Sequence, residues 1–469
     1  MQVDVQPSNA TARDAAMAEL AATFGAERIV TGKDIRNRHG TDESYHPTVA
    51  PDAVFFARST EEVSQAVTIC AKHKWPVIPF GVGTSLEGGV AALRGGLSVD
   101  VSEMNKILAV NADDLDVRVQ AGVTRKQLNE YLRDTGLMFP IDPGADASIG
   151  GMCATRASGT NAVRYGTMRD NVLSLTVVMA DGRVVKTARR AKKSAAGYDL
   201  TRLFVGSEGT LGVITEIQLK VYGIPEAISS AVVQFDDLES AVSTCVLTIQ
   251  SGVPVARMEL LDDSQMGACI AYSKLEGYTA RPTLFFEFHG SETGVVEQAE
   301  TVQGIAAEFG GTDFKWATKA EDRNKLWEAR HNAFYAALAL RPGAKGWPTD
   351  VCVPISRLAE CITETKKDLA ETGLLAPLVG HVGDGNFHLV YVIDPESQEE
   401  MRLAKEHSDR MVLRALSMDG TCTGEHGVGY GKMEFLAAEL PEAIPVMRAV
   451  KQALDPDNIM NPGKLFRMN

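Results

Sequence analysis

Two histidines flank a short turn sequence late in the chain. The stretch Gly380–His388 reads Gly-His-Val-Gly-Asp-Gly-Asn-Phe-His, and its Gly-Asp-Gly-Asn core is rich in residues that accept positive φ angles. Apolar, strand-like sequence precedes and follows it. If residues 383–386 form the loop of a hairpin, His381 faces His388. Directly paired residues have Cβ atoms about 4.5–5.5 Å apart, so the sequence predicts that the two imidazoles share one metal ion.

A third ligand is expected from Glu425, in the stretch Thr421–Gly429, which reads Thr-Cys-Thr-Gly-Glu-His-Gly-Val-Gly. Glycines on both sides of Glu425 and His426 let the backbone approach a bound group. Neutral imidazoles and a carboxylate suit Zn²⁺ and related divalent ions such as Mn²⁺. The alternative is that His381 and His388 are polar residues on a solvated hairpin, but the apolar flanks argue against an exposed strand. This set of residues does not by itself name a reaction.

Three glycine-rich tracts in the first half of the chain are candidates to hold a phosphate-bearing ligand. The first, Pro79–Gly89, offers converging backbone N–H groups and the hydroxyls of Thr84 and Ser85. The second covers Asp142–Gly166, and the third covers Gly206–Gly212. Taken alone, the first tract could also be a flexible loop, and it is not the GxGxxG fingerprint that opens a helix. Together, small residues at this density let the backbone pack closely on a flat or phosphate-bearing ligand.

Periodicity predicts the elements that position these tracts. A strand at 53–57, a helix after Ser59 and strands at 77–80 and 97–101 form a βαβ-like unit, and Ser59-Thr60-Glu61-Glu62 is typical of a capping box. The remaining pattern predicts a hairpin of 173–180 and 183–186 turned by Asp181-Gly182, a half-buried strand at 213–221, a strand at 283–288, and helices near 238–251, 292–309, 321–340, 355–372, 396–418 and 441–454.

Length and composition limit the class of protein. A chain of 469 residues exceeds one ordinary core, and the fall in glycine density at Gly223–Pro225 marks a domain boundary. The net charge of −14 argues against nucleic acid as a partner. No apolar run approaches the roughly 18 residues of a membrane span, and residues 1–22 lack the pattern of a secretory signal.

Seven scattered cysteines without a CxxC motif fit reduced thiols in a cytoplasmic protein. The same scatter excludes an internal iron–sulfur cluster, which needs clustered thiolates. Cys422 lies near the predicted metal site, and we expect a small buried filler rather than a reactive thiol.

The three glycine tracts, in this order, resemble the FAD-binding domain of the vanillyl-alcohol oxidase and p-cresol methylhydroxylase superfamily. The metal hairpin, the Thr-Gly-Glu-His-Gly sequence and the Asn461–Lys464 end (Asn-Pro-Gly-Lys) are similar to one branch of it. That branch contains D-lactate dehydrogenases, glycolate oxidase flavoprotein subunits and D-2-hydroxyglutarate dehydrogenases. The resemblance extends over Pro51–Phe466, and Arg341–Gly346 and Thr349–Leu358 are most similar to the cytochrome type of D-lactate dehydrogenase.

This resemblance implies a role for each motif. His381, His388 and Glu425 match the family's metal ligands, and His426 matches its general base. Arg330 matches the arginine that binds the substrate carboxylate, although its sequence context alone would make it an ordinary charge on a helix surface. The residues that the resemblance assigns to FAD are Pro79, Gly81, Gly83, Thr84, Ser85, Gly88, Pro143, Gly144, Ser148, Gly150, Gly151, Ala154, Ser158, Gly159, Tyr165, Gly166, Glu208, Gly209, Gly212, Val213, Ile214 and Asn461.

Three positions depart from patterns in related enzymes. The hydroxyglutarate enzymes carry an asparagine where this chain has Val390 and a lysine where it has Pro348. Both would serve a second carboxylate, so their absence favours a monocarboxylate substrate. Relatives that bind FAD covalently often carry a histidine where this chain has Thr84, so non-covalent FAD is expected.

The implied architecture is α+β, with a bipartite FAD-binding domain of the vanillyl-alcohol oxidase type. Residues 1–222 form that domain, residues 223–425 form an α+β substrate- and metal-binding domain with an antiparallel sheet, and residues 426–469 return to the FAD domain. The implied reaction is oxidation of a D-2-hydroxy monocarboxylate, D-lactate first, to the 2-oxo acid with FAD and one divalent ion. Electrons then pass to an external acceptor such as a quinone or a cytochrome. We expect a cytoplasmic location, with peripheral contact to the inner membrane open, and a dimer is compatible with the sequence.

Other functions remain open at this point. Within the branch, the substrate could instead be D-2-hydroxyglutarate or glycolate. The His-His-Glu set could serve a metal-dependent hydrolase, which would leave the glycine tracts unexplained. A flavin-binding redox sensor or electron-transfer subunit without its own substrate is the third alternative.

Overall fold

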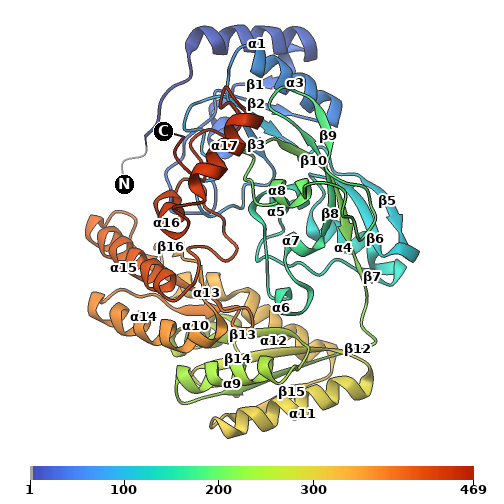
Figure 1. Cartoon of the computed structure of the whole chain (residues 1–469). Helices are drawn as coiled ribbons and strands as arrows, with labels where there is room; N and C mark the ends of the chain where they lie inside the picture. Colours follow the sequence, from blue (N-terminus) through green and yellow to red (C-terminus); the bar gives the residue numbers. More distant parts are fainter. Residues whose placement is uncertain (1–3, 469) are drawn as a thin grey trace. The chain divides into compact units, whose positions relative to one another are not determined.

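The computed structural model describes residues 4–468. Contacts divide the chain into two compact units. Unit 1 comprises Met1–Ser158, Gly166–Ile224 and Glu425–Asn469, and unit 2 comprises Gly159–Tyr165 and Pro225–Gly424. Both units combine helices with sheets (Figure 1), which confirms the predicted α+β class.

The first sheet of unit 1 has the strand order β1-β2-β4-β3. Its strands are β1 (Ile29–Val30), β2 (Ala53–Phe56), β4 (Leu97–Asp100) and β3 (Val77–Phe80). Strands β2 and β3 both run parallel to β4, which lies between them, and helix α3 (Thr60–Lys72) connects β2 to β3. The predicted βαβ-like unit is therefore present.

The predicted capping box at the start of α3 is half formed. The Ser59 hydroxyl accepts a hydrogen bond from the Glu62 N–H at 3.2 Å. The Glu62 carboxylate, however, accepts from the N–H of Arg58 at 2.9 Å instead of returning to Ser59. Glu62 also forms an ion pair with Arg28, which draws its carboxylate away from the cap.

The second sheet of unit 1 is antiparallel, with the order β5-β6-β10-β8-β9. Its strands are β5 (Ile107–Asn111), β6 (Asp116–Gln120), β10 (Val213–Lys220), β8 (Val172–Val178) and β9 (Val184–Lys186). The hairpin β8–β9 agrees with the prediction. Strand β10 is more buried than predicted, because Gln218 turns inward and donates to the Asp116 carboxylate at 2.6 Å.

The C-terminal segment packs on the first sheet of unit 1. The Val77 N–H donates to the Ile459 carbonyl at 2.8 Å, and the Asn461 N–H donates to the Val77 carbonyl at 2.8 Å. Figure 1 shows the red helix α17 (Ile444–Leu454) beside this sheet. The other helices of unit 1 are α1 (Ala10–Phe24), α2 (Lys33–His39), α4 (Arg125–Leu132), α5 (Ile149–Thr155), α7 (Met168–Asn171), α8 (Leu200–Phe204) and α16 (Met433–Glu439), and a small sheet pairs β11 (Tyr222–Gly223) with β7 (Leu137–Met138). Helices α4, α5, α7, α8 and α16 were not predicted from the sequence.

Unit 2 is built on one eight-stranded sheet, all of whose strand pairs are antiparallel. Seven strands follow the order β15-β12-β14-β13-β18-β19-β16, and β17 pairs separately with β19. Their bounds are β15 (Thr312–Ala317), β12 (Ala227–Gln234), β14 (Thr283–Gly290), β13 (Val255–Leu261), β18 (Leu378–Gly380), β19 (Asn386–Ile393), β16 (Lys345–Pro348) and β17 (Val351–Cys352).

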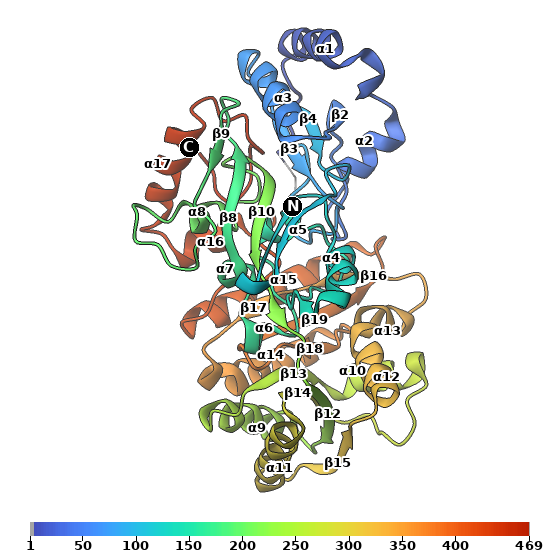
Figure 2. The same cartoon turned by 90° about the vertical axis from the view of Figure 1, so that its right-hand side faces the viewer.

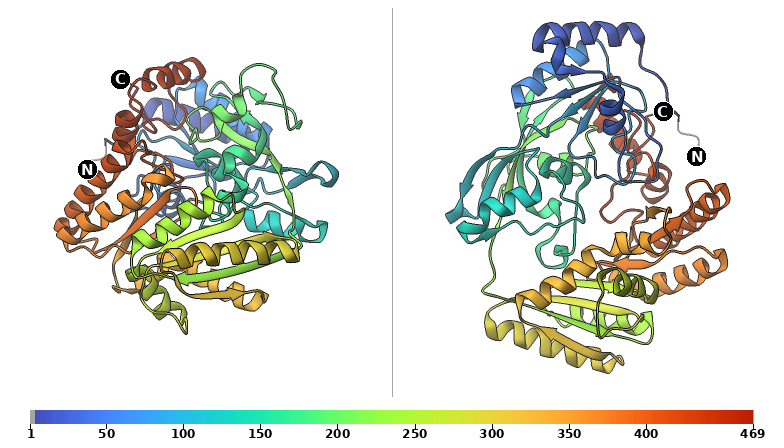
Figure 3. Two further views of the ribbon diagram at one scale, coloured as in Figure 1. Left: turned by 60° about the horizontal axis from the view of Figure 1, so that its bottom comes forward. Right: turned by 180° about the vertical axis from the view of Figure 1, so that it is seen from behind.

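Helices cover both faces of this sheet. Figure 2 shows α9 (Leu238–Gln250) and α11 (Glu292–Glu308) on one side of β12–β14, and α10 (Asp263–Ser273), α12 (Ala320–His331) and α13 (Ala333–Ala339) on the other. Figure 3 shows the gold helix α11 running along the sheet. Helix α14 (Leu358–Thr372) contacts both α9 and α15 (Gln398–Ser417), and α6 (Ala162–Tyr165) contacts β13. The single helix predicted at 321–340 is two helices, interrupted at Asn332.

The face of the sheet under α10 and α12 is apolar around Trp327. Val232, Leu261, Phe285 and Val379 cluster there with the indole. Because side chains alternate along a strand, residues two or four positions from these point to the same face. A charged region therefore adjoins the apolar one on this face. It consists of Arg257 and Glu259 in β13, Glu287 and His289 in β14, and His381 after β18.

Candidate metal centre and flavin cradle

The hairpin that carries the two histidines has a different register from the predicted one. Val379, not His381, is paired with His388, and Leu378 is paired with Leu389. The loop is larger than expected, because the His381 carbonyl accepts from the N–H groups of Asp384 at 3.1 Å and Asn386 at 3.3 Å. The predicted direct pairing was therefore wrong. Since the slip is two residues, the strand alternation still puts both imidazoles on one face of the sheet.

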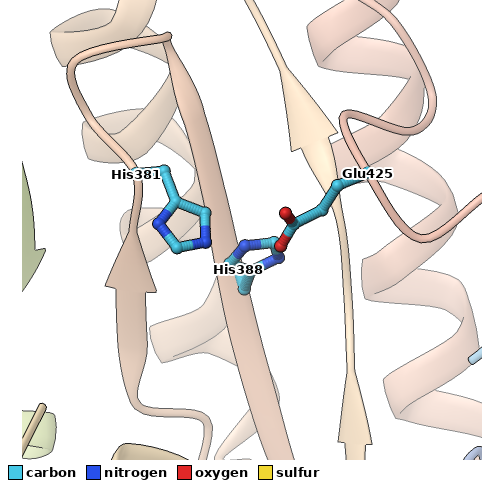
Figure 4. Close-up of side chains that lie close together, drawn as sticks. All are labelled: His381, His388 and Glu425. Atoms are coloured by element: carbon cyan, nitrogen blue, oxygen red, sulfur yellow. The ribbon is translucent and has the colours of Figure 1, made fainter. Parts of the chain in front are cut away.

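The structure brings His381, His388 and Glu425 together. One ligand atom from each residue lies within 4.8 Å of the other two, and Figure 4 shows the three side chains directed at one point. The two imidazole centroids are 5.4 Å apart. Glu425 directly follows Gly424, the last residue of unit 2. The side chains of His381, His388 and Glu425 are 12%, 8% and 13% exposed, so a bound ion would be largely shielded from bulk water.

Hydrogen bonds to the far side of each ring orient the two imidazoles. The His388 Nδ1 atom lies 2.7 Å from the Thr349 carbonyl oxygen, which only accepts, so Nδ1 carries the proton. The His381 Nδ1 atom lies 2.7 Å from Oε1 of Glu259. In the neutral tautomers that these partners favour, each Nε2 lone pair is left to bind a metal ion.

A buried carboxylate supports the segment that carries Glu425. Asp350 is fully buried and accepts from the Asn386 amide and the Thr423 hydroxyl, both at 2.7 Å. Gly424 lies against the same amide, and a Cβ there would stand 2.4 Å from Asn386 Nδ2. Gly424 therefore packs closely on the Asn386 side chain, whereas the approach of this backbone to a bound group stays a prediction.

Arg330 is a buried residue in the last turn of α12, not a charge on a helix surface. Its Nε and Nη2 both donate to Oε2 of Glu259, at 3.0 and 2.5 Å. Burial raises the pKa of the Glu259 carboxyl, but His381 and Arg330 outweigh burial and hold it below its usual value. Glu259 thus joins the carboxylate-binding candidate to a metal-binding candidate.

Sequence reasoning missed Glu259. The signal that could have found it is an acidic residue within the apolar strand sequence Val255–Leu261, on the same side as Arg257. A charge inside a buried strand needs a partner, and the strand itself does not show which residue that is.

His426 adjoins the metal ligands. Its Nε2 atom is 3.9 Å from Oε1 of Glu425, and its side chain is 11% exposed. The imidazole therefore lies close to the ligand atom of Glu425. This position suits a group that accepts a proton beside the metal-binding residues.

The three glycine tracts converge within unit 1. Gly209, in the third tract, lies against the Pro79 ring of the first. The Asn461 amide donates to the carbonyls of Gly89 at 3.0 Å and Glu208 at 2.8 Å, and the Glu208 N–H donates to the Ala154 carbonyl at 2.9 Å. Residues from four separate parts of the chain therefore form one backbone cradle.

The chemistry of this cradle fits FAD. Gly83 and Gly88 have φ angles of +75° and +72°, which favour glycine, and a Cβ on Gly81 would stand 2.3 Å from the Ser148 hydroxyl. Among residues 4–468, the buried hydroxyls of Ser148 and Ser207 have no hydrogen-bond partner. Buried polar groups are normally satisfied, so these hydroxyls are suited to a polar ligand against the cradle.

Glu208 has a role inside the protein. Its carboxylate accepts from the N–H groups of Val428 and Gly429 at 2.7 and 2.8 Å, and burial raises its pKa to about 7. It therefore ties the third tract to the C-terminal segment.

The other residues that the family resemblance assigns to FAD lie in several elements. Gly150, Gly151 and Ala154 lie in α5, and Val213 and Ile214 begin β10. The segment Gly159–Tyr165 belongs to unit 2, where the Tyr165 hydroxyl is 2.8 Å from His289 Nδ1. The remaining predicted positions, Thr84, Ser85, Pro143, Gly144, Ser158, Gly166 and Gly212, lie in loops or turns of unit 1.

Two family models match the chain. The model of an FAD binding domain matches residues 51–188, and the model of the C-terminal domain of FAD linked oxidases matches residues 224–465. The chain therefore belongs to the FAD-linked oxidases, and it is an oxidoreductase. This membership accounts for the glycine tracts, which the hydrolase alternative leaves unexplained.

Curated relatives of this chain include D-lactate dehydrogenases and a glycolate oxidase subunit, which belong to the branch that the sequence resembles. The chain is 53% identical over 466 residues to "Probable D-lactate dehydrogenase, mitochondrial" of Danio rerio, covering 98% of this chain and 94% of that protein. It is 50% identical over 447 residues to "D-lactate dehydrogenase [cytochrome], mitochondrial" of Arabidopsis thaliana, covering 95% and 79%. It is also 35% identical over 420 residues to "Glycolate oxidase subunit GlcD" of Bacillus subtilis, covering 89% of each.

Solved structures confirm the fold. p-Cresol methylhydroxylase superposes with a TM-score of 0.83 at 17% identity, covering 98% of each chain. Alkyldihydroxyacetonephosphate synthase superposes with a TM-score of 0.75 at 21% identity, covering 98% of this chain and 86% of that one. The two-domain FAD-binding architecture expected from the resemblance is therefore confirmed.

Two further expectations concern membranes and thiols. Within residues 4–468, no helix combines the length and the apolar character needed to cross a bilayer. Cys422 is among the six buried cysteines, in keeping with a small buried filler.

Proposed function

We propose that this chain oxidises D-lactate, or a closely related D-2-hydroxy monocarboxylate, to the 2-oxo acid, using non-covalent FAD and one divalent ion, Zn²⁺ or Mn²⁺. The observation that carries the proposal is the connected cluster around Glu259. His381, His388 and Glu425 share one point, and Glu259 joins His381 to Arg330. A 2-hydroxy acid carries its hydroxyl next to its carboxylate, so a metal-binding set linked to a guanidinium suits it.

Each side chain of the cluster has a distinct task in this proposal. Arg330 would bind the substrate carboxylate, because a planar guanidinium offers paired donors. His381, His388 and Glu425 would hold the ion, and His426 would take the hydroxyl proton as general base. When bound, FAD accepts the electrons that leave C2, and a divalent ion polarises the hydroxyl as a Lewis acid.

The choice of a monocarboxylate is supported by two positions that prove to be neighbours. Pro348 and Val390 are directly paired between β16 and β19, and Val390 is two residues from His388 on the same face of the sheet. Val390 packs in an apolar cluster with Ala337 and Val392. A second substrate carboxylate would meet apolar side chains here, which favours D-lactate over D-2-hydroxyglutarate.

The names of the relatives bear on the electron acceptor and the location. The printed name of the Arabidopsis thaliana relative contains the word cytochrome, which supports a cytochrome as the external acceptor, with a quinone as the alternative. That name and the one from Danio rerio also contain the word mitochondrial, whereas the composition of this chain led to a cytoplasmic location with peripheral contact to the inner membrane. Fractionation of source cells would separate the two locations. Light scattering would show whether the protein is a dimer, which the sequence allows.

Anaerobic mixing of the purified flavoprotein with 2-hydroxy acids tests the proposal. We expect D-lactate to bleach the bound flavin, and L-lactate to leave it oxidised. Faster bleaching by D-2-hydroxyglutarate or glycolate would replace D-lactate with one of these alternatives. A flavin that no hydroxy acid bleaches would contradict the proposal and favour a redox sensor.

A further inference from the structure

We propose that Glu259 is a positioning residue that sets the spacing between the carboxylate anchor Arg330 and the metal ligand His381. This inference rests on the function proposed above and adds a residue that neither the motifs nor the resemblance indicated. Glu259 would act through Arg330 and His381, the two site residues that its carboxylate contacts.

The two oxygens of one carboxylate serve two different partners. Oε1 lies 2.7 Å from His381 Nδ1, and Oε2 accepts from Arg330 Nε and Nη2 at 3.0 and 2.5 Å. The Glu259 side chain is fully buried, so water does not compete for either oxygen. Bonds from buried, charged groups are short and directional, and they restrict both partners at once.

The backbone of Glu259 is held on both sides. Strand β13 is an inner strand, paired with β14 through Glu259 and Phe285 and with β18 through Leu260 and Gly380. His381 follows β18 directly, and Arg330 projects from the last turn of α12. Glu259 thus connects the sheet, the metal hairpin and a helix at one rigid position.

The bond pattern also leaves each partner ready for its task. His381 donates through Nδ1, which leaves Nε2 for the ion. Arg330 uses its Nε and Nη2 on Glu259, and no residue within 4–468 accepts a hydrogen bond from its Nη1. The Nη1 side of the guanidinium can therefore bind a carboxylate while Glu259 holds the other side.

A simpler reading is that Glu259 only neutralises a buried arginine. The neighbouring strand offers a matched case with that role. Glu287 is also buried, with Oε1 2.9 Å from His289 Nε2 and Oε2 3.4 Å from Arg257 Nη1. Neither His289 nor Arg257 is a candidate metal ligand or carboxylate anchor. Because His289 also contacts the FAD candidate Tyr165, Glu287 is a control for metal affinity and stability only.

The test compares Glu259→Gln with Glu287→Gln in the FAD-loaded protein. Metal is stripped, and Mn²⁺ or Zn²⁺ affinity is measured by competition with a chelator, without turnover. Loss of a residue that orients a metal ligand typically weakens affinity roughly 10- to 100-fold. We expect a loss of that size and a raised KM for D-lactate in Glu259→Gln. Glu287→Gln should keep wild-type metal affinity while losing a similar amount of thermal stability.

A second variant, Glu259→Asp, separates spacing from charge. It keeps the carboxylate but shortens its reach, so we expect it to retain stability better than Glu259→Gln and still to raise KM. Wild-type metal affinity and KM in both Glu259 variants, with only Tm lowered, would overturn the inference. Wild-type values in Glu259→Asp alone would also overturn it, because charge and not spacing would then be what matters.

The failure of the proposed function gives a different result. A wild-type protein that binds no divalent ion in the same titration, or whose flavin D-lactate does not bleach, contradicts the function before any variant is compared. With both wild-type results positive, the variants test Glu259 alone.

Discussion

At the residue scale, Arg330 is expected to be more than a source of positive charge. Arg330→Lys keeps the charge but cannot hold Glu259 and a substrate carboxylate with one planar group. We expect KM for D-lactate to rise about 10- to 100-fold, since hydrogen bonds to charged groups are worth about 1.5–3 kcal/mol. Steady-state kinetics measure this effect.

The matched control for Arg330 is Arg402→Lys in α15. Arg402 also makes two bonds to one carboxylate, that of Glu399, but its side chain is 52% exposed. Arg402→Lys should leave KM for D-lactate unchanged. An unchanged KM in Arg330→Lys as well would remove Arg330 from the substrate site.

His426 and Glu425 are neighbours whose losses should differ. Glu425→Gln removes a ligand charge, so activity should fall and partly recover when metal is added. His426→Ala should keep metal and flavin but lose roughly 10²–10⁴-fold in rate, the usual contribution of one proton-transfer group. Stopped-flow flavin reduction with parallel metal analysis checks both variants.

Rescue by added metal gives a second criterion for His426. A divalent ion does not replace a general base, so added metal should leave the rate of His426→Ala low. If His426→Ala instead loses its metal and recovers when metal is supplied, His426 is a ligand and not the base.

At the element scale, Asp368 joins two long helices of unit 2. Its carboxylate, on α14, accepts from Arg410 and Arg414 on α15 at 2.7–3.0 Å, and these guanidiniums hold its pKa at about 2. Because the folded pKa lies below the ordinary value of 3.8, the stabilisation is complete above that pH and is lost as pH falls toward 2.

Asp368→Asn should therefore destabilise the protein by about 1–2 kcal/mol at neutral pH, the scale of charge-assisted bonds near a surface. The Tm difference from wild type should shrink when thermal unfolding is followed below pH 4. Asp409→Asn is the control, since Asp409 pairs with Lys405 within α15 at the surface and such pairs contribute about 0.3–0.5 kcal/mol. A Tm difference independent of pH would contradict the assignment.

A substitution at Gly88, in the first glycine tract, tests whether that loop belongs to the flavin cradle. A Cβ there would stand 2.2 Å from the Tyr430 ring at φ +72°, so Gly88→Ala should displace the loop and lower FAD retention. Gly136 has the same φ of +72°, but a Cβ on it would meet no atom within 4 Å. Gly136→Ala should thus show only the backbone cost of about 1–2 kcal/mol and keep its flavin.

Flavin absorbance per protein after gel filtration measures this comparison. Equal flavin content in the two glycine variants would show that the first tract tolerates a side chain, and would argue against its role in the cradle.

At the scale of the whole molecule, the two candidate sites use different residues. His381 and His388 belong to unit 2, Glu425 begins the last segment of unit 1, and the first and third glycine tracts lie in earlier segments of unit 1. We therefore expect chelation to abolish turnover while FAD stays bound, and Zn²⁺ or Mn²⁺ to restore activity. Turnover, metal content and flavin absorbance measured on one sample check this, and loss of flavin in step with metal would contradict it.

Much of the fold follows from local pattern in the sequence. The strands and helices of the first βαβ-like unit, the β8–β9 hairpin and most helices of unit 2 lie close to their predicted bounds. Amphipathic spacing and turn residues act over a few positions, so helices, strands and turns can be predicted from one sequence. The metal-binding candidates could be identified from the sequence for the same reason, because His381, His388 and Glu425 stand in short motifs with flanking glycines.

What the tertiary structure decided were contacts between distant positions. Glu259 meets Arg330 71 residues away and His381 122 residues away, and no local period relates them. The hairpin register also depended on tertiary structure, because loop bonds to the His381 carbonyl moved the pairing by two residues. A sequence pattern shows that a buried charge needs a partner, but packing across the sheet selects the partner, and that selection gives the site its geometry.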